Sequence, residues 1–383
     1  MDFNLSKAEQ LIQKSAREFG QKVLEPASAK IFNSNHISSQ IIEDLASLDM
    51  LAIPLPEEYG GGNAGYLSYI LAMEQLSRAC SGIGMIISVN TVGLTVIHTF
   101  GTPEQKQKYL PRGVTGAELL SFAFTEPETG SDPKQLTTTV IRDGDHYIIN
   151  GTKRFISNAG YKGPMVVVAK EAETGRASAF IIDKFCPGYS LSEPWNKIGA
   201  HGGCLYDVYL DNVRIPAENL LGASGQGLLV LKTAMIFGKI GLTGLFLGGC
   251  LAAYEEALHF ARTKTHRGEA IASKFQHIQI AVADMAMKYD AAKWYAYHLG
   301  FAADNTKDMM LLVKEAALCK VFVAEAAVDL ARIAINIHGS YGVMQDYKIA
   351  RLWGDVIIGP QVEGTASLLK ILAAGMIIDR DTF

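Results

Sequence analysis

The apolar residues of this 383-residue chain change their spacing twice, and this change constrains the fold more than any other feature. The first third has helical spacing, and two helix starts are marked by capping residues: Ser6 with Glu9, and Thr102 with Gln105. From about residue 120 to about residue 225 the pattern becomes that of strands, and after Gly227 long helical patterns return. Helices on either side of a run of strands predict an α+β chain, because the alternation that builds a parallel doubly wound sheet is absent.

We predict three domains on this basis: an N-terminal helical domain at residues 1–119, a β domain at 120–227 and a C-terminal helical domain at 228–383. Domains of roughly 100–200 residues make two or three domains reasonable for this length. Two dipeptides typical of hairpin turns, Asp143-Gly144 and Asn150-Gly151, divide the β domain. Its predicted strands are residues 137–141, 147–149, 165–168, 180–182 and, as an edge-like strand, 206–210.

Charge and cysteine content argue against several classes of protein. The formal net charge is −4 and the basic residues are scattered, which disfavours a nucleic-acid partner or an anionic membrane surface. The five cysteines lie far apart and the nine histidines show no ligand spacing, so we predict no metal site. The N-terminus lacks the features of a signal or transit peptide, which favours a cytoplasmic location.

Two glycine-rich segments resemble functional motifs without fitting them. The longest uncharged run, residues 240–254, is shorter than the about 20 apolar residues that cross a membrane, so we expect a buried helix with close neighbours. Residues 60–65 match the dinucleotide-binding pattern G-x-G-x-x-G. However, Pro54 and Pro56 precede them where that pattern requires a central strand, which favours a surface turn.

Two other segments carry residues suited to chemistry. The first, Phe122–Asp132 (FAFTEPETGSD), is a predicted strand end where Gly130 permits a bend whose backbone N–H groups can bind an anion. An ordinary strand-end loop is the simpler interpretation of these residues alone. The second is Val362–Thr365 (VEGT), which follows a largely apolar stretch. Glu363 is therefore either a surface or capping acid, or a desolvated general base whose pKa is raised by burial.

Together with other motifs, these segments resemble the acyl-CoA dehydrogenases. The matches are Thr125–Asp132 (TEPETGSD), Asn150–Asn158 (NGTKRFISN), Asp211–Pro216 (DNVRIP), Leu221–Gly227 (LGASGQG), Phe275-Gln276, Ala283–Met285 (ADM) and Glu363–Thr365 (EGT). The resemblance covers nearly the whole chain. It implies an N-terminal helical domain, an antiparallel, barrel-like β domain and a C-terminal four-helix domain, assembled as a homotetramer.

The resemblance also implies a cofactor. FAD is expected between the β domain and the C-terminal helices, with its adenosine end reaching a neighbouring subunit. The Ser157 hydroxyl is expected near flavin N5. The expected cofactor-binding residues are Phe122, Phe124, Thr125, Gly130, Ser131, Phe155, Ser157, Lys264, Asn336, Gly339 and Thr365.

For the reaction, the resemblance implies an acyl-CoA substrate, removal of its α-proton by Glu363 and hydride transfer to FAD, which gives the 2-enoyl thioester. Fixed donors must stabilise the enolate charge that develops. Ser131, Lys239 and Gly364 are expected to contact the substrate, and electron-transfer flavoprotein is the expected electron acceptor. Some relatives carry the base on an earlier helix, but Gly238 stands there in this chain.

The sequence departs from the family pattern at several positions. Lys239 stands where most relatives have arginine, which removes a bidentate donor. Residues 264–268 (KTHRG) and 336–340 (NIHGS) replace motifs that meet FAD, and Gly354-Asp355 replaces an Arg-Asp pair. Gly84 occupies the position of an arginine found in relatives that act on dicarboxylyl-CoA, so we expect an uncharged acyl chain.

Three alternatives stay open on the sequence alone. The first two keep desaturation by Glu363: an acyl-CoA oxidase, and a dehydrogenase of acyl groups on a carrier protein. The third is a non-catalytic scaffold or thioester-binding protein without FAD. The altered residues at 264–268 and 336–340 are what keeps this third alternative open.

Overall fold

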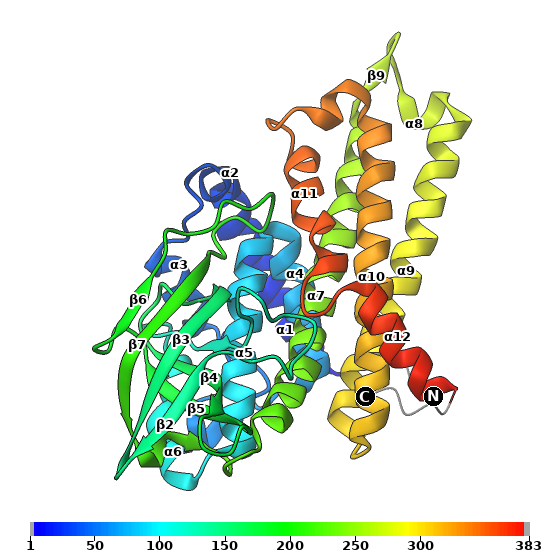
Figure 1. The fold of residues 1–383 in the computed structure, drawn as a ribbon. Coiled ribbons are helices and arrows are strands. Elements are labelled where there is room, and N and C mark those ends of the chain that lie inside the picture. Colours follow the sequence, from blue (N-terminus) through cyan, green and yellow to red (C-terminus); the bar gives the residue numbers. More distant parts are fainter. Residues whose placement is uncertain (1–3, 379–383) are drawn as a thin grey trace.

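The computed structural model describes residues 4–378, and its helices precede and follow a central sheet as predicted (Figure 1). The N-terminal helices are α1 (Lys7–Phe19), α2 (Glu25–Ser34), α3 (Ser39–Ser47), α4 (Gly65–Ala79), α5 (Ser81–Phe100) and α6 (Pro103–Tyr109). The strands of the central sheet are β1 (Ser121–Ala123), β2 (Thr139–Asp143), β3 (His146–Ser157), β4 (Pro164–Glu171), β5 (Ala177–Asp183), β6 (Tyr189–Leu191), β7 (Leu205–Pro216) and β8 (Leu220–Leu221). The C-terminal elements are α7 (Gly227–Thr263), β9 (Thr265–His266), β10 (Glu269–Ala270), α8 (Ile271–Lys274), α9 (Gln276–Asn305), α10 (Met309–His338), α11 (Lys348–Ile357) and α12 (Ala366–Ile377).

The two predicted helix starts are confirmed. The Ser6 hydroxyl accepts from the backbone N–H of Glu9, and the Glu9 carboxylate accepts from the backbone N–H of Ser6. Thr102 and Gln105 make the same reciprocal pair at the start of α6. The glycine-rich residues 60–65 follow a short 3₁₀ turn rather than a strand, as expected from the two prolines before them.

The sheet has the order β6-β7-β3-β2-β4-β5-β8, with β1 beside β4. Most pairs are antiparallel, but β4 runs parallel to both β1 and β2. The Asp143-Gly144 turn joins β2 to β3 as predicted. The prediction of a second turn at Asn150-Gly151 is wrong, because these residues lie inside β3 where its register against β7 shifts, which is a bulge. The prediction that 206–210 is edge-like is also wrong, because β7 lies between β6 and β3.

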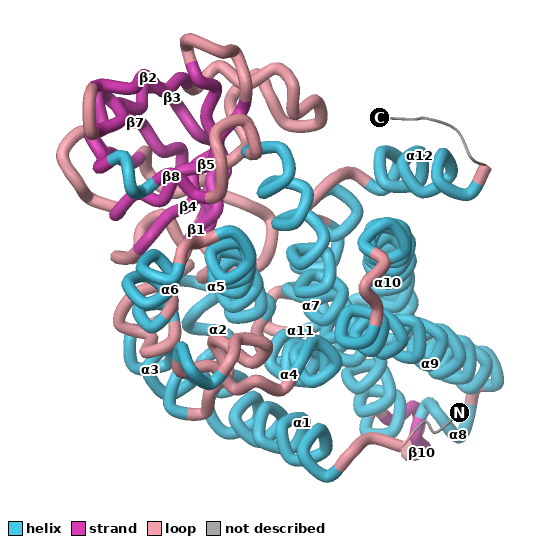
Figure 2. Tube along the Cα trace, turned by 90° about the horizontal axis from the view of Figure 1, so that it is seen from below, coloured by secondary structure: helices cyan, strands magenta, loops and turns pink. Residues whose placement is uncertain are grey.

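The N-terminal and C-terminal helices share one hydrophobic core, while the sheet lies to one side of them (Figure 2). That core contains buried side chains from α4, α5, α7 and α10, such as Leu76, Ile87, Leu245 and Leu330. The helical segments therefore form one packed body despite their separation in the sequence. The domain boundaries at 119/120 and 227/228 stay predictions.

The glycine-rich run of residues 240–254 lies in α7 as a buried helix with close neighbours, as expected. A Cβ on Gly241 would lie 2.5 Å from Ser88 Oγ, and a Cβ on Gly244 would lie 2.7 Å from Met73 Cβ. The described helices α5 and α7 are long and apolar enough to cross a membrane by length and composition, and residues 348–361 with 366–377 would add a third if that bent pair were one span. Burial of 78% and 89% of the apolar windows of α5 and α7 inside the protein accounts for their composition.

Candidate active site

Glu363 lies in a left-handed turn between a short 3₁₀ segment, Gly359–Gln361, and α12. Its φ angle is 54°, and that of Gly364 is 95°. A non-glycine residue in this conformation costs of order 1–3 kcal/mol and persists only where its surroundings enforce it. Thr365 then begins α12 as its N-cap, because its hydroxyl accepts a hydrogen bond from the backbone N–H of Leu368. This local role was not predicted for Thr365, whose contact with the cofactor stays a prediction.

The buried ammonium of Lys320 on α10 binds this turn. Its Nζ donates to the carbonyl oxygens of Val362 at 2.6 Å and of Gly364 at 3.1 Å, the two residues that flank Glu363. Lys320 is fully buried. The sequence analysis missed this residue, because a lone lysine carries no motif. Its place among the buried, small apolar residues of α10 is the signal that could have found it.

The carboxylate of Glu363 faces α7. Its Oε2 atom is enclosed and has no hydrogen-bond partner among residues 4–378. A Cβ on Gly238 would lie 2.8 Å from this oxygen, so the carboxylate needs glycine at that position of α7. Burial raises the pKa of Glu363 above 4.5, while the charges of Lys239 and Lys320 oppose the rise. An enclosed, unpaired carboxylate with a raised pKa is suited to general base catalysis.

Lys239 was predicted to contact the substrate, and its side chain lies in the interior beside the base. The residue is 6% exposed, and its Nζ donates to the carbonyl oxygen of Met235, one turn earlier on α7, at 2.8 Å. Burial lowers the pKa of Lys239 to about 8, although the nearby charge of Glu363 opposes this. The charge of Lys239 therefore acts on the carboxylate of Glu363, and the contact with substrate stays a prediction.

The predicted flavin residues of the β domain come together where β1 and β3 end. The backbone N–H of Arg154 donates to the carbonyl oxygen of Thr125 at 2.7 Å, so Phe155 lies close to Thr125. Phe155 occupies the irregular stretch of β3 between Lys153 and Ile156, with a φ angle of 59°. The predicted Gly130 and Ser131 lie exposed in the loop that follows Thr125.

A buried ion pair between Glu126 and Lys153 fixes this end of the β domain. Lys153 Nζ donates to Glu126 Oε1 at 2.7 Å, and both side chains are fully buried. The same ammonium donates to the carbonyl oxygens of Phe124 and Val168. Glu126 also accepts from the backbone N–H groups of residues 137 and 138. Both residues belong to the motifs noted in the sequence, but the sequence alone assigned them no role.

Helix α7 connects the β domain to the base. The apolar cluster at this junction comprises Phe124, Leu136, Val168 and Leu231, with Phe122 and Met235 packed against it. Gly238, which faces Glu363, follows Met235 by about one helical turn. The predicted aromatic residues 122 and 124 therefore pack against the same helix whose Gly238 faces Glu363.

Three predicted cofactor residues lie far from the base, at the other end of α7 (Figure 1). Lys264 follows α7, Asn336 lies in the last turn of α10, and Gly339 follows that helix. Helix α7 continues for about 38 Å beyond Gly238 at 1.5 Å per residue. Lys264 Nζ donates to the Tyr341 hydroxyl at 3.2 Å and lies 4.5 Å from its ring centroid. The predicted residues thus form two groups, one near the base and one near the β9–β10 hairpin.

The residues at the ends of β1 and β3 fit a planar cofactor such as a flavin. The ring centroids of Phe155 and Trp195 lie 5.3 Å apart, and the two residues leave 49% and 41% of their surfaces exposed. Thr125 and Ser157 are half-buried, and their hydroxyls make no hydrogen bond within residues 4–378. Exposed aromatic surface with a few unused donors is what a ring-shaped ligand requires. In the part of the chain that the structure describes, no group of three or more His, Cys, Asp or Glu residues could hold a metal ion.

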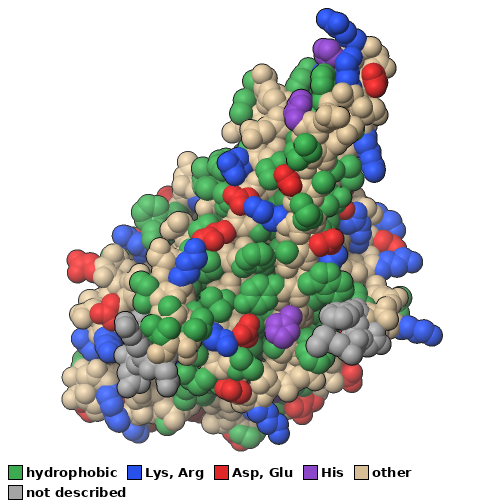
Figure 3. All heavy atoms as spheres, turned by 90° about the vertical axis from the view of Figure 1, so that its right-hand side faces the viewer, with side chains coloured by type: hydrophobic (Ala, Val, Ile, Leu, Met, Phe, Trp, Pro, Cys, Tyr) green, Lys and Arg blue, Asp and Glu red, His purple; other side chains and the backbone are tan. Residues whose placement is uncertain are grey.

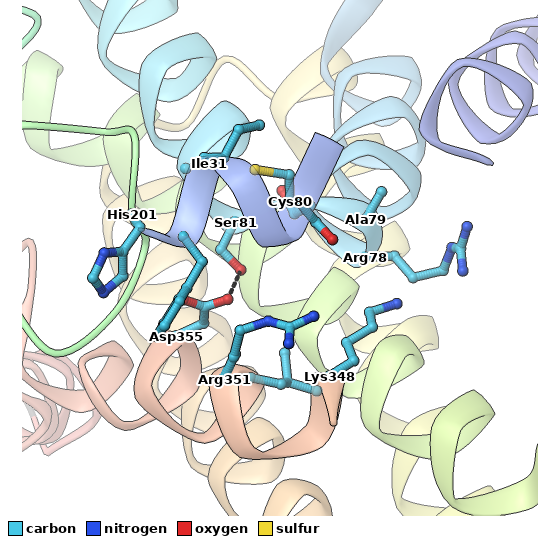
Figure 4. A pocket seen from close by; sticks show the side chains of 14 residues that line it. Ile31, Arg78, Ala79, Cys80, Ser81, His201, Lys348, Arg351 and Asp355 are labelled. Atoms are coloured by element: carbon cyan, nitrogen blue, oxygen red, sulfur yellow. Dashed lines mark hydrogen bonds between the residues drawn. The ribbon is translucent and has the colours of Figure 1, made fainter. Parts of the chain in front are cut away.

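A small cavity of about 40 Å³ lies between α2, α4 and α11, and Glu363 does not line it (Figure 4). Arg78, Lys348, Arg351 and Asp355 line it. Asp355 accepts a hydrogen bond from Ser81 Oγ at 3.1 Å, and burial raises its pKa. A cavity of this size holds at most a few water molecules at about 10–15 Å³ each, so it is too small for a thioester substrate.

The departure at Gly354 is explained by packing next to this cavity. A Cβ on Gly199 would lie 2.1 Å from the Gly354 carbonyl oxygen, and a Cβ on Gly354 would lie 2.3 Å from the Ile198 carbonyl oxygen. Asp355 Oδ1 accepts from the backbone N–H of Ala200 at 2.6 Å. The loop around residue 200 therefore packs directly on α11, and no space remains for an arginine side chain at position 354.

Three protein-family models match consecutive parts of the chain. They describe the N-terminal domain of acyl-CoA dehydrogenases at residues 6–117, the middle domain at 121–213 and the C-terminal domain at 225–377. Together they cover both the strand-end residues near Phe155 and the turn that carries Glu363.

Named proteins and solved structures match over almost the full length. An acyl-CoA dehydrogenase of Bacillus subtilis is 36% identical over 96% of this chain and 97% of its own. The caffeyl-CoA reductase-Etf complex subunit CarC of Acetobacterium woodii is 32% identical over 98% of this chain and 99% of its own. The structure of butyryl-CoA dehydrogenase from Megasphaera elsdenii aligns with a TM-score of 0.94 at 30% identity, over 99% of this chain and 100% of that one. A glutaryl-CoA dehydrogenase from Mycobacterium smegmatis in complex with FADH2 aligns with a TM-score of 0.92 at 25% identity, over 99% and 96%.

Proposed function

The chain belongs to the acyl-CoA dehydrogenase family of FAD-dependent oxidoreductases that act on CH–CH groups, and we propose that Glu363 is its catalytic base. The observation that carries this proposal is the enclosed, unpaired Oε2 of Glu363 opposite Gly238. A base must be dry, correctly oriented and free to accept a proton. Glu363 is enclosed and keeps an oxygen without a donor, whereas Glu126 is buried but fully paired with donors.

In the proposed reaction, Glu363 takes the α-proton of an acyl thioester onto its carboxylate. The electron pair of the α C–H bond forms the double bond between Cα and Cβ, and the β-hydrogen leaves with its electron pair. When bound, FAD accepts this hydride. Removing water from the site strengthens the electrostatic interactions that the charged intermediates experience. The products are the 2-enoyl thioester and a protonated Glu363.

The turn that carries the base also supplies a donor for the thioester oxygen. The backbone N–H of Glu363 makes no hydrogen bond to another residue in the range 4–378, and Gly364 follows it with a φ angle of 95°. Donors aimed at the oxygen where charge develops stabilise the transition state more than the ground state. Gly364, Ser131 and Lys239 stay proposed substrate contacts, as the family resemblance implies.

The acyl group is proposed to be uncharged. A Cβ on Gly84 would lie 2.1 Å from Ser77 Oγ and 3.2 Å from Leu245 Cδ1. This position is packed against α4 and α7, so no basic side chain from it can meet a second carboxylate on the substrate.

An exposed apolar stripe on α9 supports the proposal of a homo-oligomer, for which the family predicts a tetramer. Ile280, Met287, Trp294 and Phe301 recur at intervals of seven residues, with 62%, 65%, 46% and 57% of their surfaces exposed. Figure 3 shows hydrophobic side chains gathered on this side of the molecule. Such a heptad stripe is suited to packing against another helix, and a second copy of this chain is the proposed partner.

The distant group around Lys264 is proposed to meet the cofactor of a neighbouring subunit. Its separation from Glu363 along α7 is what supports this assignment, together with the cationic residues of the β9–β10 hairpin. Electron-transfer flavoprotein is the proposed electron acceptor, and the match to an Etf-complex subunit supports it. A cytoplasmic location is proposed by analogy with the bacterial relatives.

Anaerobic titration of the FAD-loaded protein with short, medium, branched and cyclic acyl-CoAs tests the proposed function. Loss of flavin absorbance with one class is the expected result, and that class identifies the acyl group. A flavin that is bleached only by acyl groups on a carrier protein would support the second alternative. Fast reoxidation of the reduced flavin when O₂ is then admitted would support an oxidase, and failure to bind FAD would support the scaffold.

A further inference from the structure

Lys320 is a buried cation whose hydrogen bonds go to the backbone that carries the base. It is fully buried on α10, and among the described residues it forms no ion pair within 4 Å. Burying a charged ammonium is costly unless hydrogen bonds compensate it. Its two bonds, at 2.6 Å and 3.1 Å, go to the carbonyl oxygens of Val362 and Gly364.

These two bonds span Glu363 and the Cα atom of Gly364. A single ammonium holds the peptide that joins Val362 to Glu363 and the peptide that joins Gly364 to Thr365, so it fixes the backbone at both ends of the Glu363-Gly364 turn. The φ angle of 54° at Glu363 is strained. Hydrogen bonds from a charged donor are stronger than those between neutral groups, so two of them can offset the strain of this turn.

We infer that Lys320 is the positioning residue of the base: it holds the left-handed turn at residues 362–364 so that the Glu363 carboxylate faces Gly238 of α7. The inference rests on the proposed role of Glu363 as base. It adds a residue outside the sequence motifs, on a helix that contributes no predicted catalytic group. It also explains why the ammonium bonds to backbone: a direct bond to the carboxylate would occupy the lone pairs that must take the proton.

Two cations act on Glu363, one from each helix packed against it. Lys239 lies on α7 and Lys320 on α10, and the charge of each lowers the pKa of Glu363 against the effect of burial. Lys239 Nζ bonds within its own helix, to Met235. Loss of either charge therefore moves the pKa of the base upward, while only the loss of Lys320 also releases the turn.

Lys320→Met in the FAD-loaded protein tests the inference. We expect hydrogen exchange at residues 362–365, measured by mass spectrometry without substrate, to become at least about tenfold faster. With the acyl-CoA that bleaches the wild-type flavin most rapidly, flavin reduction should slow about 10²-fold, as for a small displacement of a catalytic group. The acid limb of the pH profile of flavin reduction should move up by roughly one pH unit, because an opposite charge beside the base is lost.

Lys184→Met is the matched control. Lys184 is also a buried lysine, and its Nζ donates to the carbonyls of Leu119 and Asn158 and to Ser121 Oγ, with no contact to the base. It should lower thermal stability while leaving both the acid limb and the exchange at residues 362–365 unchanged. If Lys320→Met does not fold, Lys320→Gln keeps N–H donors without the charge, and should shift the acid limb with a smaller increase in exchange.

The inference is overturned if Lys320→Met shows both hydrogen exchange at residues 362–365 and an acid limb of flavin reduction like those of the wild type. Where Lys320→Met does not fold, the same result in Lys320→Gln overturns it. Glu363→Gln, measured in parallel, separates this from failure of the proposed function. Flavin reduction at the wild-type rate in Glu363→Gln means that the base is misassigned. An inactive Glu363→Gln beside an unaffected Lys320 variant means that only the role of Lys320 is wrong.

Discussion

Glu126 in the β domain and Glu363 before α12 both carry a carboxylate that is enclosed by protein near a buried lysine. The two carboxylates nevertheless differ in their hydrogen bonding and in the direction of their pKa shifts. Lys153 donates directly to Glu126 at 2.7 Å. Burial alone would raise the pKa of Glu126, but the charge and hydrogen bonds of Lys153 and the donors of residues 137 and 138 lower it to about 2. Lys320 instead bonds to the backbone on both sides of Glu363, whose Oε2 has no partner in the described chain.

The difference shows that the atom a buried lysine bonds to decides what the neighbouring carboxylate can do. A carboxylate whose lone pairs are all taken by donors stays ionised and stabilises its surroundings. A carboxylate that feels a nearby positive charge without a hydrogen bond keeps a lone pair for a proton. The same two residue types therefore make a structural anchor in one region and, as we propose, a reactive group in the other.

The largest expected effect comes from exchanging the carboxylates for amides. Glu363→Gln should reduce the rate of flavin reduction by about 10²–10⁴-fold, since a positioned general base contributes that much. Its stability should change little, because Oε2 has no partner to lose. Stopped-flow absorbance and thermal unfolding measure both quantities. Glu126→Gln should show the reverse, with lower stability and a flavin reduction rate close to wild type in the folded fraction.

The next largest effect is expected on stability, when Lys153, the lysine paired with Glu126, is removed. Lys153→Met leaves Glu126 buried without its cation, which destabilises a protein by about 3–5 kcal/mol. Urea unfolding of the FAD-loaded protein measures the loss. The double variant Lys153→Met with Glu126→Gln should recover part of it, because the buried charge is gone. Equal stability of the single and double variants would contradict the ion pair's assigned role.

A smaller effect is expected when the space beside the base is filled. In Gly238→Ala the added Cβ would lie 2.8 Å from Glu363 Oε2, so the carboxylate must move. Flavin reduction should slow about 10²-fold. Stability should be nearly unchanged, because alanine favours the helix by about 1 kcal/mol over glycine. Gly249→Ala on the same helix, which displaces only a methyl group of Val356, is the control and should retain the wild-type rate.

The smallest expected effect is a difference between the two carboxylates in their pH dependence. Burial raises the pKa of Glu363 above 4.5, so flavin reduction should decline on the acid side with a midpoint above pH 4.5. The pKa of Glu126 is lowered to about 2. Its contribution to stability is therefore complete above pH 4.5 and is lost as the pH falls toward 2, where the unfolded chain binds the proton more readily.

Rate and thermal unfolding measured over the same pH series check this separation. Activity should be lost at a higher pH than the stability contributed by Glu126, and Glu126→Gln should remove that acid-dependent loss. An acid limb at or below pH 4.5 would show that Glu363 is not desolvated as the structure indicates.

Local sequence signals predicted much of the fold because they act over a few residues. The capping boxes at Ser6 and Thr102 and the hairpin at Asp143-Gly144 depend on neighbouring residues, and all three are confirmed. Asn150-Gly151 has equally good turn chemistry, but pairing with β7 on the far side continues β3 through it and converts the pair into a bulge. Long-range pairing overrides a local preference when it satisfies more backbone hydrogen bonds.

The sequence by itself determined the class of fold, the family and the identity of Glu363 as the candidate base, because spacing and motifs are written in consecutive residues. The tertiary structure alone decided the environment of that base. Gly238, Lys239 and Lys320 lie on two helices distant in the sequence, and only packing brings them to one carboxylate. Burial, charge and the absence of a partner are properties of that assembled neighbourhood, which explains why the lysine that binds the turn carries no motif of its own.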